Sequence, residues 1–277
     1  MKQQKAFTLL ELIFVIVILG IVSSIGSEII AKVYGQYIVQ RAQHRASLKT
    51  ELAIQIALNR LQQHIPHTIY RIKNDNTNES MDTVQSGASE DYKGIQWVSA
   101  DIDSFNYYDS GIKKTGWSGF CDVNASSASD ISTPGSDIDS VATIVSNLGG
   151  NLANGVIYFP FGNDYNISGG SDENITLDSA IPGGGMIYEQ YKLAWTSYAL
   201  VVESETINGK TYKNLYLYYN FAPIPGSSLG NNKSLLLRNI REFKLSYVGE
   251  TLRFKICKSE NIGEGNITAC KEKAVLR

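Results

Sequence analysis

Apolar residues are concentrated at the start of the chain. Between Phe7 and Ser27, a stretch of 21 residues holds a single charged side chain, that of Glu11. With a rise of about 1.5 Å per residue, a helix over this stretch is about 31 Å long, the thickness of a bilayer core. Two lysines and no acid precede it, so the positive-inside tendency places Met1 in the cytoplasm and the rest of the chain outside.

The helical pattern continues beyond the apolar stretch. Polarity rises after Ile30, but no helix breaker occurs before Pro66. Apolar residues then recur at helical spacing, at Leu48, Leu52, Ile56, Leu58, Leu61 and Ile65. We expect a helix from Phe7 to His64, 58 residues and about 87 Å long. Its first half projects, and its second half packs on the chain's own globular domain through this stripe.

The remainder of the chain alternates between polar turns and short apolar runs that are typical of strands. Residues 71–90 are polar and predict a surface loop. Asn208-Gly209 is a strong hairpin signal. Residues 104–154 are rich in Ser, Asp, Asn and Gly and too long for an ordinary connection, so we expect an elaborated loop insertion or a partly disordered segment. The predicted strands cover residues 94–100, 156–159, 195–203, 215–219, 234–237, 241–247 and 251–256.

These patterns predict an α+β fold, in which one long helix lies over an antiparallel sheet. We expect a membrane-spanning helix over residues 7–28, an amphipathic continuation over residues 29–65, and a β-rich head over residues 66–277. Composition is globular, with 43% hydrophobic and 19% charged residues. The net charge of -2 leaves no global basic field, which argues against a general nucleic-acid binder.

The three cysteines fit an oxidising compartment, which the head meets if it lies outside the cytoplasm. Cys257 and Cys270 are thirteen residues apart and flank a turn-like segment. A bridge between them removes about 3 kcal/mol of loop entropy from the unfolded chain. Cys121 is left over, and we expect it to be a free thiol.

The sequence shows no arrangement typical of an enzyme or a metal site. His44 and His64 fall on the predicted helix and His67 lies just past it, without an accompanying cluster of cysteines or acids. The acids near Asp75 and the pair Asp137 and Asp139 could hold Ca²⁺, but they lack EF-hand spacing and a solvated loop is favoured. We therefore expect no catalytic site, no cofactor and no bound metal.

Asparagine sequons form a further pattern. Six N-x-S/T sequences begin at Asn78, Asn124, Asn166, Asn174, Asn232 and Asn266. Four of them, at Asn124, Asn166, Asn174 and Asn266, carry an acid two residues earlier, which is the extended form used by the bacterial periplasmic oligosaccharyltransferase. All four fall in predicted loops, as glycan acceptors should. Acidic turns rich in Asn and Ser also produce such a pattern by chance, so glycosylation is a hypothesis.

Three interpretations of the N-terminal segment compete. A secretory signal peptide would be cut near Ser24-Ile25-Gly26, and an ordinary single-span anchor would stay uncut. Neither explains Glu11, because a carboxylate inside a membrane is costly and by default functional. A free α-amine at Phe7, created by a cut after Ala6, would give this charge a partner.

The residues around this cut resemble the cleavage and methylation motif of type IV prepilins and type II secretion pseudopilins. The resemblance covers residues 2–26 and rests on Lys5, Ala6, Phe7, Thr8, Leu9, Leu10, Glu11 and Gly20. It implies that residues 1–6 are a leader, that a prepilin peptidase cuts between Ala6 and Phe7, and that the new amine of Phe7 is methylated. Glu11 would then neutralise the amine of a neighbouring subunit in the filament.

Two positions depart from that motif. Ala6 stands before the cut where the family usually has Gly, which could slow processing. Glu28 replaces a usual Pro, so the helix should lack the usual kink and gains a charge where the chain leaves the membrane. A disulfide between Cys257 and Cys270 that pins the C-terminal strands also resembles pilins.

The resemblance implies a structural subunit, a minor pseudopilin or minor pilin of a type II secretion pseudopilus or type IV pilus. Its partners would be other pilin-like subunits, the peptidase, an assembly ATPase and a platform protein in the bacterial inner membrane, with the head in the periplasm. The alternative is a membrane-anchored binding module or adhesin at a pilus tip. The loop at residues 104–154 holds only Lys113 and Lys114 as cations, so it gives little support for DNA binding. An aromatic groove near Trp117 and Phe120 would favour the binding module. A tethered periplasmic enzyme ranks third.

Overall fold

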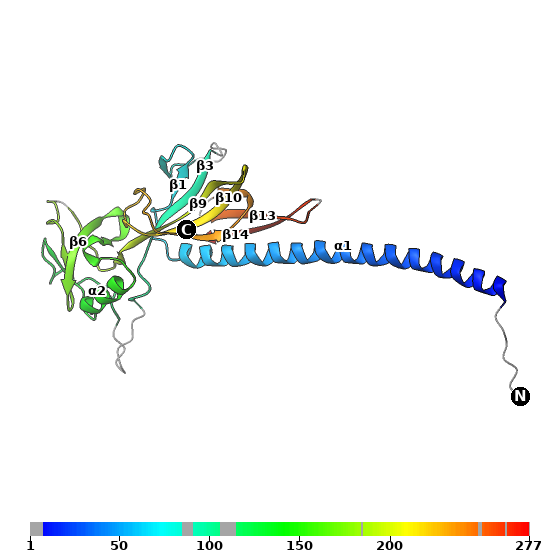
Figure 1. Ribbon diagram of the computed structural model, residues 1–277. Helices are drawn as coiled ribbons and strands as arrows, with labels where there is room; N and C mark the ends of the chain where they lie inside the picture. The colour runs from blue at the N-terminus through cyan, green and yellow to red at the C-terminus, as the bar shows by residue number, and fades with distance from the viewer. Residues whose placement is uncertain are drawn as a thin grey trace, which may run out of the picture.

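The computed structural model describes residues 8–84, 91–105, 115–183, 185–248, 251–263 and 265–276. Its longest element is α1 (Leu9–Leu61), a single helix of 53 residues whose first half projects far from the rest of the molecule (Figure 1). At about 1.5 Å per residue it is about 80 Å long. The helix passes Glu28 without interruption, as expected from the absence of Pro at that position, and Lys32 forms an ion pair with Glu28 at 2.7 Å.

The second half of α1 packs on the head through a face that shares only Leu58 and Leu61 with the predicted stripe. The buried residues are Ala46, Thr50, Ala53, Ile54, Ala57, Leu58 and Leu61. Leu48, Leu52 and Ile56 are 50%, 64% and 45% exposed, so their predicted burial is wrong. Successive residues turn by about 100°, which centres these three side chains on the side opposite the middle of the buried face. Small side chains on the buried face allow the helix to approach the sheets closely.

The main lobe contains a six-stranded antiparallel sheet, in the order β11-β10-β9-β3-β1-β2. Asn208 and Gly209 both have positive φ angles, 50° and 74°, in the turn between β9 and β10, which confirms the predicted hairpin. The short hairpin β1–β2 lies where a polar loop was predicted, because strands this short give little alternating pattern. The strands are β1 (Tyr70–Lys73), β2 (Asn78–Ser80), β3 (Tyr92–Ser99), β9 (Thr196–Ile207), β10 (Lys210–Phe221) and β11 (Lys233–Leu237).

A three-stranded antiparallel sheet, β12-β13-β14, completes the main lobe. Its strands are β12 (Ile240–Val248), β13 (Thr251–Asn261) and β14 (Asn266–Leu276), and β13 and β14 run alongside α1 (Figure 1). One core joins the helix to both sheets: it includes Ile54 and Leu61 of α1, Trp97 of β3 and Phe254 of β13. The structure thus confirms the predicted α+β architecture of a long helix followed by antiparallel sheets.

A second lobe is inserted between two neighbouring strands of the large sheet. Ser99 at the end of β3 pairs with Thr196 at the start of β9, so residues 100–195 leave and return at one point. This lobe has a five-stranded sheet in the order β4-β7-β6-β5-β8. Its elements are β4 (Asp130–Ser132), α2 (Ile138–Asn147), η1 (Leu152–Asn154), β5 (Val156–Tyr158), η2 (Pro160–Gly162), β6 (Asp164–Ser171), β7 (Asn174–Leu177) and β8 (Lys192–Ala194).

The insertion is therefore longer and more ordered than the loop predicted for residues 104–154. Within the described residues, that segment contributes β4, α2 and η1 to a separate core with Ile138, Val141, Ile157 and Leu193. Asp137 caps α2 by accepting a hydrogen bond from the backbone N–H of Ser140 at 3.2 Å. Strands of three or four residues in a Ser-rich and Asn-rich sequence carry too short a pattern to be recognised before the fold brings them together.

Candidate functional site

The proposed assembly residue, Glu11, lies at the N-terminal end of α1. Ala6 and Phe7 lie outside the described residues, and Glu11 lies in the first turn of the helix. Thr8 is the N-cap, and its Oγ1 accepts a hydrogen bond from the backbone N–H of Glu11 at 3.3 Å. Thr8 and Glu11 have the spacing of a capping box, and a carboxylate is favoured near the positive end of the helix dipole. The Glu11 side chain thus stands where the helix dipole favours a negative charge.

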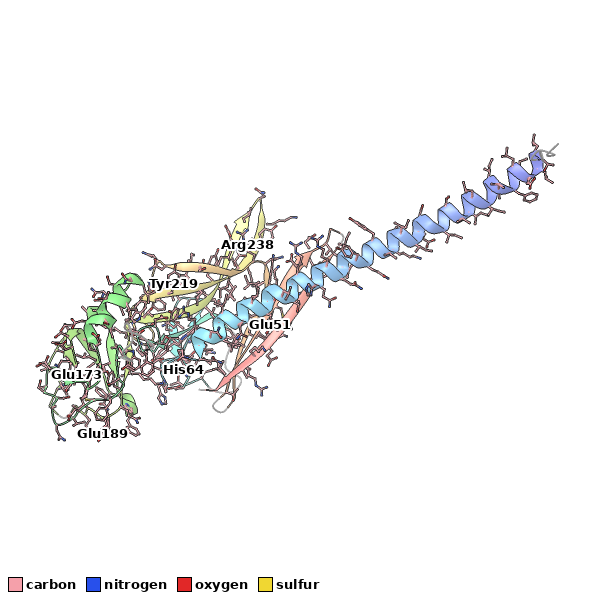
Figure 2. All side chains as sticks on the ribbon, turned by 90° about the horizontal axis from the view of Figure 1, so that it is seen from below. Glu51, His64, Glu173, Glu189, Tyr219 and Arg238 are labelled. Atoms are coloured by element: carbon pink, nitrogen blue, oxygen red, sulfur yellow. A yellow bond between two sulfur atoms is a disulfide. The ribbon has the colours of Figure 1, made fainter. Side chains whose placement is uncertain are left out.

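The projecting half of α1 exposes apolar side chains on all sides. They include Leu9, Phe14, Leu19 and Ile30, with exposures of 77%, 60%, 65% and 71%. Figure 2 shows that the side chains along the first half of the helix stand free of the head. The most apolar 18-residue window has a mean hydropathy of 2.6 and none of it is buried, so this helix is long and apolar enough to cross a membrane. Such a surface is unstable in water and requires lipid or neighbouring helices.

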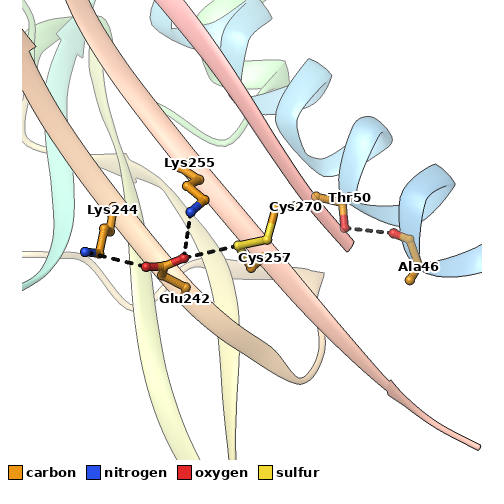
Figure 3. The surroundings of a disulfide bond; sticks show 7 residues. All are labelled: Ala46, Thr50, Glu242, Lys244, Lys255, Cys257 and Cys270. Carbon is orange, nitrogen blue, oxygen red and sulfur yellow. Dashed lines mark hydrogen bonds and ion pairs between the residues drawn. A yellow bond between two sulfur atoms is a disulfide. The ribbon is translucent and has the colours of Figure 1, made fainter. Parts of the chain in front are cut away.

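The predicted disulfide is present. Cys257 and Cys270 face each other across the β13–β14 ladder and are joined by a bond of 2.10 Å (Figure 3). Beside it, Glu242 of β12 pairs with Lys255 at 3.1 Å, and this hydrogen bond lowers the pKa of the Glu242 carboxyl below its usual value. The bond ties the last strand, which packs on α1, to the middle of its sheet.

The third cysteine is free, as predicted, and the structure buries it in the second lobe. The thiol of Cys121 lies 3.6 Å from the hydroxyl of Ser126, and burial raises the pKa of the thiol. Trp117 is also buried in this core, and its indole Nε1–H donates to the carbonyl oxygen of Asp101 at 2.9 Å. Phe120 is 46% exposed, so only one of the two aromatic residues proposed as a groove lies at the surface.

Asp101 stands where the chain leaves the main lobe for the insertion. Its side chain is buried, and Ser104 donates to it from both its backbone N–H and its hydroxyl. The backbone N–H of Asp101 donates to the carbonyl oxygen of Leu193 at 2.8 Å. This hydrogen bond joins the two chain segments that connect the lobes. Burial raises the pKa of the Asp101 carboxyl to about 6. Nothing in the sequence pattern distinguished this residue from the acids around it.

The histidines occupy structural positions. His44 is exposed on α1, and His64 lies just past the helix end at the junction of the lobes, with its Nδ1 2.8 Å from the carbonyl oxygen of Leu61 (Figure 2). His67 contacts Asp82 at 2.9 Å. In the described part of the chain, Glu242 with Cys257 and Cys270 forms the group best placed to ligate a metal, but both of its sulfurs belong to the disulfide.

The acids that were considered for Ca²⁺ have other partners. Asp75 accepts hydrogen bonds from the backbone and hydroxyl of Thr77, which lower the pKa of its carboxyl. Asp137 caps α2, and Asp139 accepts from the backbone N–H of Asp172 at 2.9 Å. Each carboxylate thus stabilises a turn or a helix end.

The four acid-preceded sequons are all exposed but differ in backbone context. Asn124 lies in a turn, whereas Asn174 and Asn266 are the first residues of β7 and β14. Three of them lie in strands, so their placement in loops was wrong: Asn166 pairs with Val156, Asn174 with Ser132 and Ser171, and Asn266 with Asn261. Asn166 also lines a cleft of about 580 Å³. If modification follows folding, Asn124 is the best placed acceptor of the four, because it lies in a turn rather than in a paired strand.

Residues 1–27 match the family described as the prokaryotic N-terminal methylation motif. Comparisons with curated proteins and with solved structures found no match. The matched segment is the one that carries the predicted cut site, Glu11 and the first turns of α1. It is followed by the long helix and the antiparallel sheets described above. The chain therefore carries a prepilin-type N-terminal methylation motif on a pilin-like α+β architecture.

Proposed function

We propose that this protein is a minor pseudopilin or minor pilin, a structural subunit of a type II secretion pseudopilus or a type IV pilus. The observation that carries the proposal is the projecting half of α1, whose apolar side chains are unburied and whose first residues match the methylation motif. Lipid covers this surface before assembly, and neighbouring helices cover it afterwards. The helix therefore serves first as a membrane anchor and then as part of the filament core. It supports a structural rather than a catalytic role.

The exposed stripe on the second half of α1 supports packing between subunits. Leu48, Leu52 and Ile56 follow one another at intervals of four residues on the face turned away from the chain's own sheets. Full burial of each such side chain is worth about 1.5 to 3 kcal/mol. A neighbouring helix that covers the stripe therefore adds several kcal/mol to assembly beyond the membrane-spanning part.

We further propose that the head is periplasmic, with Met1 in the cytoplasm. The proposal rests on the two lysines that precede the apolar stretch and on the disulfide, which persists in an oxidising compartment. The inserted second lobe makes the head large and elaborate, which favours a minor position in the filament over that of a compact major subunit. A prepilin peptidase, other pilin-like subunits, an assembly ATPase and a platform protein are the proposed partners.

The N-terminal residue and mass of the protein recovered from membranes of its native host test this proposal. We expect residues 1–6 to be absent and Phe7 to carry a methyl group on its amine. An intact Met1, or a start near Ser27, would refute the pilin pathway.

A charge-neutral variant tests the role of Glu11 in assembly. Glu11→Gln keeps the size of the side chain and removes the charge, so we expect normal processing but loss of incorporation into filaments. Glu28→Gln is the matched control, because Glu28 is an exposed acid of the same helix whose partner, Lys32, lies within the chain. Filaments sheared from cells and probed for the subunit give the readout. Equal incorporation of both variants would contradict the assigned role of Glu11.

A binding module at a filament tip is the second candidate. The second lobe favours it, because a separate core inserted between two paired strands is unnecessary for helix assembly.

A further inference from the structure

A cleft of about 840 Å³ lies between residues 65–68, which follow the end of α1, and the second lobe. Its volume is in the range of ligand sites. Aromatic and proline side chains dominate its lining, including Pro66, Tyr158, Pro160, Phe161 and Pro225. The prolines come from three separate segments and fix the walls, so a ligand meets a preformed site with little ordering cost.

Two opposite charges flank the floor of this cleft. Tyr158 at the end of β5 pairs with Asp164 of β6 on one side and with Lys192 of β8 on the other. Residues directly opposite each other in antiparallel strands share a face, so the three side chains form a row on one face of the sheet. Neighbouring Cα atoms in such a row are about 5 Å apart, which places Asp164 and Lys192 about 10 Å from each other.

Neither charge is balanced within the described part of the chain, where Asp164 and Lys192 have no ion-pair partner. Both residues are exposed, yet their surroundings in the cleft remove part of their hydration. Burial raises the pKa of the Asp164 carboxyl and lowers that of the Lys192 ammonium. A cation and an anion held apart and partly desolvated in this way favour a ligand that brings a counter-charge to each.

The rim of the cleft carries a strained and exposed aromatic residue. Phe161 has a φ of 66° and a ψ of 22°, a conformation that is rare for a bulky side chain. Its side chain is 87% exposed and meets Tyr188 with ring centroids 5.5 Å apart. Burial therefore does not account for this conformation, and strain of this kind clusters at binding sites. The backbone presents the ring to whatever lies in the cleft.

We propose that this cleft binds a proline-rich peptide segment of a partner protein, one that carries a basic and an acidic side chain three residues apart. A polyproline II helix repeats every three residues and rises about 3.1 Å per residue, so residues i and i+3 point the same way about 9 Å apart. That spacing matches the separation of Asp164 and Lys192. Aromatic-lined grooves are the usual receptors for such helices. The inference goes beyond the proposed structural role and does not depend on it.

Peptide pairs test the proposal with the full-length protein in nonionic detergent micelles. The probes are acetyl-Pro-Lys-Pro-Pro-Glu-Pro-amide and its reversed-charge order, since the chain direction is open. Each has a neutral counterpart with Gln at both charged positions and a shifted counterpart with the charges two residues apart. We expect isothermal titration calorimetry, corrected for empty micelles, to give affinities at least tenfold higher for one charged probe than for its neutral and shifted counterparts. If no charged probe binds more tightly than its counterparts, the proposal is wrong.

Variants locate the site. Lys192→Gln and Asp164→Asn should each weaken binding of the charged probe about tenfold and leave the neutral probe unaffected. Lys210→Gln is the matched control, because Lys210 is exposed on the hairpin of the main lobe. An unchanged preference for the charged probe in both cleft variants would place its binding elsewhere and overturn the assignment.

Phe161→Gly adds a readout that a merely structural role would not give. Glycine adopts the same backbone conformation without strain, which offsets the entropy that it adds to the unfolded chain, so the variant should melt close to the wild type while it binds the peptide more weakly. A variant that melts close to the wild type and binds the peptide as well would contradict the role of the ring.

Discussion

Asp101 is a buried carboxyl group at the junction of the two lobes, and its replacement by Asn tests how this junction depends on pH. The folded protein raises the pKa of Asp101 from 3.8 to about 6, mainly through burial. The folded state therefore holds this proton more tightly than the unfolded chain does. Its stabilising contribution is present in full below about pH 4 and is lost as the pH rises through about 6.

A shift of about 2 pKa units corresponds to about 3 kcal/mol. Asp101→Asn keeps the shape but cannot ionise: like the protonated acid, its side chain has one oxygen that accepts from a Ser104 donor and a donor group at the other position. We expect the variant to match the wild type near pH 4 and to be more stable by up to about 3 kcal/mol at pH 8. The hydrogen bonds that Ser104 donates are stronger to a carboxylate, which makes this value an upper bound.

Denaturant unfolding at several pH values between 4 and 8, followed by tryptophan fluorescence, provides the assay. Trp117 donates to the carbonyl oxygen of Asp101, so its emission reports on the junction. Asp178→Asn, at an exposed acid of the same lobe, controls for the change in net charge. If Asp101→Asn is destabilising by the same amount at every pH, the hydrogen bonds of the carboxylate outweigh its burial and the reasoning fails.

Three further predictions concern the disulfide, the helix and the sequons. Reduction of the Cys257–Cys270 bond should lower the free energy of unfolding by about 3 kcal/mol, as measured by denaturant titration with and without reductant. Ile54→Ala should cost about 2 to 5 kcal/mol because this side chain is fully buried, whereas Leu52→Ala should barely change head stability and should reduce filament incorporation. Intact mass from a host with and without the oligosaccharyltransferase should differ by whole glycans, with Asn124 among the occupied sites; identical masses would dismiss glycosylation.

Local signals in the sequence were sufficient for several elements. The apolar stretch and the absence of a helix breaker predicted one uninterrupted helix, and Asn208-Gly209 predicted its hairpin because a two-residue turn depends on those two residues. The spacing of Cys257 and Cys270 around a turn anticipated their pairing across β13 and β14. The N-terminal motif, which includes Glu11 and Gly20, can likewise be recognised without knowledge of the fold, since a peptidase recognises it as a linear segment.

Other features depend on which surfaces meet. The apolar side chains at Leu48 and Leu52 have the correct helical spacing for a core, but the head packs on the alanine-rich face and leaves them exposed. A sequence pattern marks the apolar faces of a helix, and the close fit of the sheets selects one of them.

The sequence by itself determined the anchor, the long helix, the hairpin and the disulfide, because each arises from residues that are near one another in the chain. Only the tertiary structure decided the extent of the second lobe, since its boundaries are the paired residues Ser99 and Thr196. The row of Asp164, Tyr158 and Lys192 likewise exists only where β6, β5 and β8 pair. Contacts across strands depend on register and chain closure, which are set by burial of the whole core rather than by any local run of residues.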